Sequence, residues 1–284
     1  MPPSAVVAAW ELGLRLRERR DHLALSVGGA AKTVRMQQPN LSAVEAGKKK
    51  ITAANLTALA KRYEFDADER AELQELRISA DQRDWYHRYT WLFGDEFIRY
   101  LGLEFGAASV SVYQGSLVHG LLQTEDYAKA VIRGGSPYIR LTEVEPRCEV
   151  RLIRQQRLLG DQPLQITALL SEAVLRQEVG GRDVMRQQLE HLLNVMDEHK
   201  HVDIRIMPFG AGAHPALGGP FDVLSFDAPR LPSAVWQETL TTLTILERHQ
   251  QVREYSVALA EAMQSALSTD ESRDFIEEVA KEMT

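Results

Sequence analysis

The stretch Ser26–Gly47, SVGGAAKTVRMQQPNLSAVEAG, has the spacing of two short helices that cross through a tight turn. The turn is predicted near Arg35 and Met36. On both sides of it apolar residues recur three or four positions apart, which gives each helix an inner face made of Ala30, Ala31, Val34, Leu41 and Val44. The pattern therefore predicts a helix-turn-helix, in which the second helix is presented to the major groove of DNA.

Three further helices are predicted around this stretch. The first covers residues 10–22, Thr52 can cap the fourth, and the fifth fits residues 67–78. Ser26 can cap the second helix, although Gly28–Gly29 costs about 1 kcal/mol per glycine relative to alanine and predicts a short or frayed helix. Five short helices predict one compact domain over residues 1–79.

The outer side of the third helix carries side chains that can recognise bases. Glutamine and asparagine can each make two hydrogen bonds to adenine in the major groove. We therefore predict that this helix reads bases through Gln38, Asn40, Ser42 and Ala43. The alternative is that Gln38 and Asn40 only solvate an exposed face.

The stretch resembles the helix-turn-helix of the lambda-repressor-like (Xre/Cro) regulators, and the match runs without a gap from Ser26 to Gly47. The resemblance implies a five-helix domain that binds double-stranded DNA. It also implies that Arg20 pairs with Glu45, which would fix the third helix on the first. Finally, it implies phosphate contacts near the two ends of the motif, at Ser26, Lys48, Lys49 and Lys50.

Charge divides the chain into two parts. The 284 residues include 33 Lys and Arg against 40 Asp and Glu, a formal net charge of −7. Residues 1–65 contain 11 Lys and Arg against 5 Asp and Glu, so this part carries +6 and the remainder −13. The basic part can neutralise DNA phosphates, whereas the acidic remainder is repelled by DNA and is free to face other partners.

Composition indicates a globular protein of a reducing compartment. Cys148 is the one cysteine, so no intrachain disulfide can form, and we expect a small buried side chain there. The sequence has no run of about 18 apolar residues that could cross a bilayer, and its first residues lack the pattern of a signal peptide. We expect a cytoplasmic protein that associates with the nucleoid when it is bound to DNA.

Aromatic residues concentrate in the stretch 81–94, DQRDWYHRYTWLFG, next to Arg83 and Arg88. Such a mixture can stack on single-stranded bases, but it is more often a hydrophobic hinge between domains. We favour the hinge because no second basic groove accompanies it. Together with a helix predicted over residues 95–105, it forms a connection that spans residues 80–108.

From residue 109 to residue 284 the pattern mixes strands and helices. Strands are predicted over residues 109–113, 164–170, 202–208, 221–226 and 234–239. Helices are predicted after Thr124 and over residues 143–159, 182–198, 250–267 and 271–283. The alternation is too irregular for a doubly wound fold, so we predict a mainly α chain with a mixed α+β C-terminal domain.

The helix predicted over residues 143–159 carries a basic stripe made of Arg147, Arg151, Arg154 and Arg157. The stripe could be a second phosphate-binding surface, but we favour a solvated or ion-paired face.

Three segments of the C-terminal domain resemble the domain that follows the helix-turn-helix in WhiJ-like regulators of filamentous actinobacteria: residues 116–128, 212–215 and 219–221. That family usually has proline where this chain has His119, so the local turn is expected to differ. The resemblance implies a regulator of development or antibiotic production. It also implies an antitoxin-like partnership with a small protein encoded by a neighbouring gene.

No enzyme is expected from the sequence. The glycine-rich loop 209–220 lacks the lysine and serine that end a P-loop, and a strand follows it instead of a helix. The spacing of His191, His199, His201 and His214 is not typical of a metal site. Because no catalytic triad or carboxylate pair is evident either, we expect neither a metal nor a cofactor.

Three functional hypotheses remain. The first is a transcriptional regulator that acts as a homodimer on an inverted repeat. The second is an antitoxin-like interaction module whose DNA binding is chiefly autoregulatory, and the third is a regulator that senses a small-molecule effector. A surface for the protein partner or the effector is predicted at Trp85, Tyr89, His119 and His214.

Overall fold

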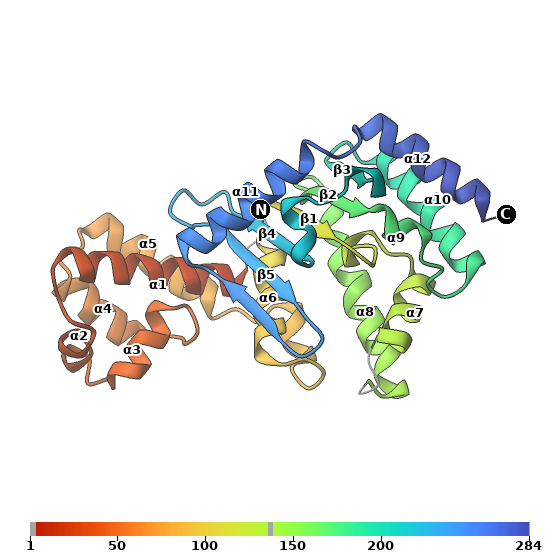
Figure 1. Cartoon of the computed structure of the whole chain (residues 1–284). Helices are drawn as coiled ribbons and strands as arrows, with labels where there is room; N and C mark the ends of the chain where they lie inside the picture. The colour runs from red at the N-terminus through yellow and green to blue at the C-terminus, as the bar shows by residue number, and fades with distance from the viewer. Residues whose placement is uncertain (1–3, 136–138, 284) are drawn as a thin grey trace.

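The computed structural model describes residues 4–135 and 139–283. It confirms the predicted fold class, a helical N-terminal part followed by a mixed α and β part with a six-stranded sheet. Figure 1 shows the N-terminal helices at one end of the molecule and α10 and α12 near the other.

The five N-terminal helices form around one apolar cluster, and we call them the head. Ser26 and Thr52 cap helices as predicted, and Asp66 caps a further helix through a capping box with Glu69. The first helix begins earlier than predicted because Ser4 caps it. The five helices are α1 Ala5–His22, α2 Val27–Thr33, α3 Gln38–Glu45, α4 Ala53–Arg62 and α5 Ala67–Ala80.

Helix α1 belongs to two apolar cores. Its first half places Val7 and Trp10 in the core of the C-terminal sheet, whereas Leu12 and Leu16 lie in the core of the head. Ser4 Oγ also donates a hydrogen bond of 2.6 Å to the carbonyl oxygen of Gly102 on α6. Helix α1 therefore contributes to the cores of both the head and the rest of the molecule.

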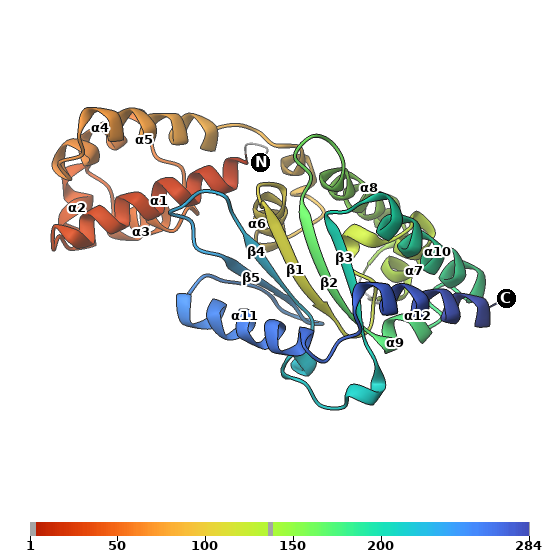
Figure 2. The same ribbon diagram turned by 90° about the horizontal axis from the view of Figure 1, so that it is seen from above.

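The sheet has the strand order β3-β2-β1-β4-β5-β6, and Figure 2 shows its strands side by side. The first three strands are parallel and the last three are antiparallel. The sequence did not predict β6, a run of four residues whose pattern does not distinguish strand from helix. The strands are β1 Ser109–Gln114, β2 Gln165–Ser171, β3 Val202–Met207, β4 Phe221–Ser225, β5 Ala234–Glu238 and β6 Leu243–Leu246.

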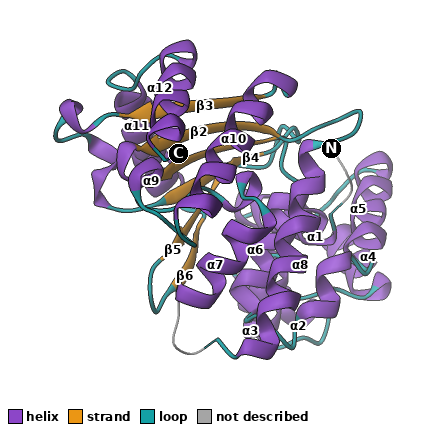
Figure 3. Cartoon of the chain, turned by 90° about the vertical axis from the view of Figure 1, so that its right-hand side faces the viewer, coloured by secondary structure: helices purple, strands orange, loops and turns teal. Residues whose placement is uncertain are grey.

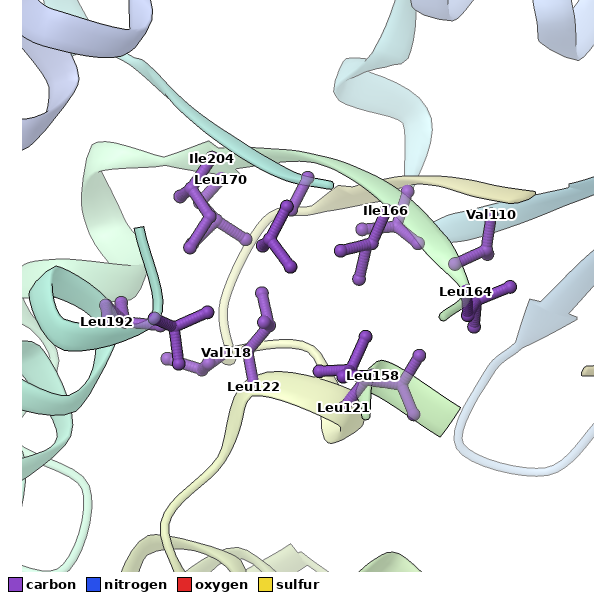
Figure 4. Packing of buried hydrophobic residues seen from close by; sticks show 14 of the residues in the cluster. Val110, Val118, Leu121, Leu122, Leu158, Leu164, Ile166, Leu170, Leu192 and Ile204 are labelled. Atoms are coloured by element: carbon purple, nitrogen blue, oxygen red, sulfur yellow. The ribbon is translucent and has the colours of Figure 1, made fainter. Parts of the chain in front are cut away.

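Helices flank the sheet (Figure 3). One face packs against α6 and α10 and the turns beside α8, and Figure 4 shows its apolar contacts around Leu122 and Ile166. The other face packs against α11, while α12 covers the edge strand β3. These helices are α6 Asp95–Phe105, α7 Glu125–Gly135, α8 Val144–Gln155, α9 Glu172–Arg176, α10 Arg182–Glu198, α11 His249–Met263 and α12 Thr269–Glu282.

The basic stripe, which runs from α8 into the 3-10 turn Gln156–Leu158 after it, differs from the prediction in part. Arg147 and Arg154 are ion-paired, with Glu143 at 3.0 Å and Glu104 at 2.6 Å. Arg154 and Arg157 are buried, however, and Arg157 donates hydrogen bonds to backbone carbonyl oxygens. A solvated face is therefore wrong for these two residues, because they satisfy polar groups inside the domain.

Candidate nucleic-acid interface

The turn between α2 and α3 lies where the sequence places it. Arg35 adopts a left-handed backbone with φ of 51°, and the Met36 amide donates a hydrogen bond of 3.0 Å to the carbonyl oxygen of Ala31. The left-handed region favours glycine, so an arginine there is strained. The turn lets α3 begin directly at Gln38, with Pro39 in its first turn.

Helix α3, which we call the recognition helix, is fixed from its inner side. Leu41 and Val44 are buried in the head core. The Arg20 guanidinium donates two hydrogen bonds to the Glu45 carboxylate, of 2.7 and 2.9 Å, and both side chains are buried. This is the pairing that the resemblance implies. The hydrogen bonds to Glu45 raise the pKa of Arg20 above its ordinary value, so this guanidinium stays charged.

The outer side of the recognition helix is open to a ligand. Gln38 and Ser42 are exposed, and Asn40 and Ala43 are half-buried. Gln38 lies against Gly28 of α2, where a Cβ atom would be 3.3 Å from Gln38 Oε1. A glycine at this position therefore leaves room for the glutamine side chain. Helix α2 is short, as predicted, and has 7 residues.

The predicted phosphate contacts lie at both ends of the motif. Ser26 Oγ accepts a hydrogen bond of 3.1 Å from the Gly29 amide as the cap of α2. The three lysines after the recognition helix are exposed, and each has a polar partner within the chain. Lys32 and Arg35 are two further exposed cations beside the turn, which were not among the predicted phosphate contacts. The sequence could have indicated them, because two positive charges stand close together at the centre of the motif.

The structure does not bring the four residues of the predicted partner surface together. Trp85 is half-buried, and Tyr89 is buried on the same 3-10 turn, Trp85–Tyr89. His119 is also buried, with Nε2 at 3.3 Å from the Asp222 carboxylate on the α6 side of the sheet. His214 is half-buried against Tyr113 on the opposite, α11 side.

His119 and Asp222 belong to a buried polar network that the sequence did not indicate. The Tyr100 hydroxyl lies 2.8 Å from the carboxylates of both Glu104 and Asp222, and Arg154 binds Glu104. Burial acts to raise the pKa of Asp222, but His119, Tyr100 and Arg154 outweigh it and hold that pKa below its ordinary value. The network ties α6, α8 and β4 together in the sheet's apolar face.

Among the described residues, no three His, Cys, Asp or Glu side chains are grouped as a metal site would require. Within the same residues, no helix combines the length and the apolar character needed to cross a membrane.

Comparisons with known proteins give two family matches. A model described as "Helix-turn-helix domain" matches residues 11–73, which contain the recognition helix. The fold and the site therefore define a DNA-binding regulator of the helix-turn-helix class. A model described as "Domain of unknown function (DUF5753)" matches residues 97–278, more than half of the chain, so the chain belongs to the DUF5753 family. No curated protein and no solved structure matches it.

Proposed function

We propose that this protein is a sequence-specific transcriptional regulator that binds double-stranded DNA through the recognition helix. The observation that carries the proposal is the contrast between the two sides of α3. Its inner side is held by the buried Arg20–Glu45 pair, while Gln38 and Ser42 are exposed on its outer side. A rigid helix with amide and hydroxyl groups facing outward can read base edges in the major groove.

Salt dependence tests this proposal directly. The full chain is incubated with genomic DNA, the retained fragments are isolated, and the dissociation constant of the best fragment is measured at several salt concentrations. Binding is expected to weaken steeply, because each lysine–phosphate contact releases counterions and adds about −0.9 to the slope of log K against log salt. A flat response would count against recognition led by phosphate contacts.

The proposed assembly is a homodimer on an inverted repeat, with the C-terminal domain as the dimerisation element. Support comes from the free edge of the sheet at β6. The Thr239 amide donates a hydrogen bond to the Thr242 carbonyl oxygen, and hydrogen-bonded pairs alternate with non-hydrogen-bonded pairs along an antiparallel ladder. Leu243 and Ile245 therefore fall in non-hydrogen-bonded pairs, so their backbone N–H and C=O groups point away from β5. These outward groups have no hydrogen-bond partner within residues 4–135 and 139–283, and a second copy of β6 can supply one.

The C-terminal domain is proposed to bind a regulator and not to catalyse a reaction. The resemblance to WhiJ-like actinobacterial proteins supports a cytoplasmic, antitoxin-like regulator whose partner is a small protein encoded next to it. Trp91 in the aromatic connection is 66% exposed and offers an apolar contact for such a partner. Co-purification of the tagged full chain with the neighbouring gene product tests this role, and loss of the complex in Trp91→Ala is expected.

Ligand sensing is a second candidate role. An open cavity of about 830 Å³ lies between Arg17 of α1 and the segment from Ile245 to Gln251, where the head meets the C-terminal domain. A small molecule bound there would touch both parts of the chain. The expected result is a rise in Tm on ligand binding that Arg248→Ala abolishes, and equal Tm shifts in both proteins would contradict this location.

A further inference from the structure

The three lysines that follow the recognition helix are all engaged by the chain itself. Lys48 Nζ lies 3.5 Å from Glu96 Oε1, and Lys50 Nζ lies 3.6 Å from Asp81 Oδ1. Lys49 Nζ donates a hydrogen bond of 2.9 Å to Asn40 Oδ1, an atom of a predicted base-reading residue. The groups proposed to bind phosphate therefore already hold oxygen acceptors in the DNA-free protein.

Two of these acceptors are carboxylates from outside the helix-turn-helix motif. Asp81 follows the last residue of α5 as its C-cap and also pairs with Arg77 of that helix at 2.7 Å, and Glu96 lies in the first turn of α6. The second carboxylate oxygen of Glu96 is buried without a hydrogen-bond partner among the described residues, so Lys48 is the cation that faces this carboxylate. We call Asp81 and Glu96 together the acidic clamp.

The geometry points to competition between the acidic clamp and DNA. A phosphate that approaches Lys48 or Lys50 meets a carboxylate a few ångströms away, and like charges at that distance repel. The side chains of both pairs are 44–54% exposed, so each pair can open at small cost. We propose that the acidic clamp is an autoinhibitory contact that lowers DNA affinity until it opens, an inference that rests on the proposed function.

The clamp also connects DNA binding to the C-terminal domain. Glu96 lies on α6, whose Leu101 and Leu103 are fully buried, and Arg99 of the same helix pairs with Glu247 after β6. Helix α6 is therefore part of the C-terminal body and not of the head. A partner that shifts α6 by an ångström or two separates Glu96 from Lys48 and releases the lysine for phosphate.

The test compares two variants that each lose one negative charge. Glu96→Gln removes the clamp, and Glu190→Gln removes a similarly exposed carboxylate that pairs with Arg186 on α10, far from the head (Figure 1). The dissociation constant of each full-length protein is measured on the genomic fragment that the wild type selects. Glu96→Gln is expected to tighten binding about threefold to tenfold at low salt, and Glu190→Gln less than twofold.

Two results would overturn the clamp. Unchanged or weaker binding by Glu96→Gln overturns the clamp, and equal tightening by both variants shows an effect of net charge only, which also overturns it. Asp81→Asn serves as a second variant and is expected to tighten binding in the same direction. If the wild type binds no fragment with a steep salt dependence, the proposed function fails. If the wild type does bind in this way, and Glu96→Gln has the same dissociation constant as the wild type, only the clamp fails.

Discussion

Arg20 and Glu45 determine, at the scale of single residues, whether the recognition helix is held in place. Their two hydrogen bonds join α1 to the last residue of α3, and both residues are buried. The desolvation of both charges offsets much of their attraction, so the pair is no large source of stability when intact. Removal of Arg20 alone has a larger cost, because the Glu45 carboxylate would then remain buried without its partner.

Arg20→Met is expected to lower the free energy of unfolding by about 3–5 kcal/mol, since Glu45 loses its counterion inside the head. Arg186→Met, which breaks a solvent-facing pair on α10, is the matched control and should cost about 1 kcal/mol or less. Urea denaturation followed by circular dichroism measures both. Similar costs for the two variants would show that the buried pair does not anchor the helix.

At Arg35, a substitution by glycine is expected to give a more stable protein than a substitution by alanine. Its left-handed backbone costs roughly 1–2 kcal/mol for a residue with a Cβ atom, and glycine avoids this cost. Arg35→Gly should therefore unfold at a higher urea concentration than Arg35→Ala, with a difference of about 1 kcal/mol. Both variants lack the charge, so the comparison isolates the backbone. An equal or lower stability of the glycine variant would contradict the strain.

At the scale of elements, the edge strand β6 is the proposed dimerisation surface. Ile245→Pro removes an amide hydrogen that points away from β5, so the sheet should keep its own ladder while the edge loses a donor. We expect sedimentation velocity to show a shift from dimer to monomer for Ile245→Pro. Ile245→Val keeps the amide and should remain dimeric. A dimer that persists in a folded proline variant would place the interface elsewhere.

The elements also show how far the sequence could be interpreted. Long amphipathic segments such as α10 were predicted at their observed bounds, because apolar periodicity and burial agree there. The short elements α9 and β6 were missed, since 5 and 4 residues carry too little pattern. The exposed position of Gln38 on α3 was predictable from local spacing. Tyr100, Glu104 and Asp222 were not, because a network of residues up to 122 positions apart exists only after folding.

At the scale of the whole molecule, the chain combines a basic head with an acidic body. The long-range field should guide DNA to the head and keep the body away from it. Helix α1 passes from one core into the other, with Trp10 on the body side and Leu16 on the head side. The same helix carries Arg20, which holds Glu45 of the recognition helix.

In the proposed function the outer side of α3 reads a DNA sequence, and a substitution of Gln38 tests this reading. Gln38→Ala and the control Gln177→Ala, which alters an exposed glutamine after α9, are measured on the selected genomic fragment and on random DNA. We expect Gln38→Ala to lose about 1–3 kcal/mol of binding free energy on the selected fragment and almost none on random DNA, while the control matches the wild type. An equal loss on both DNAs, or no loss on either, would contradict it.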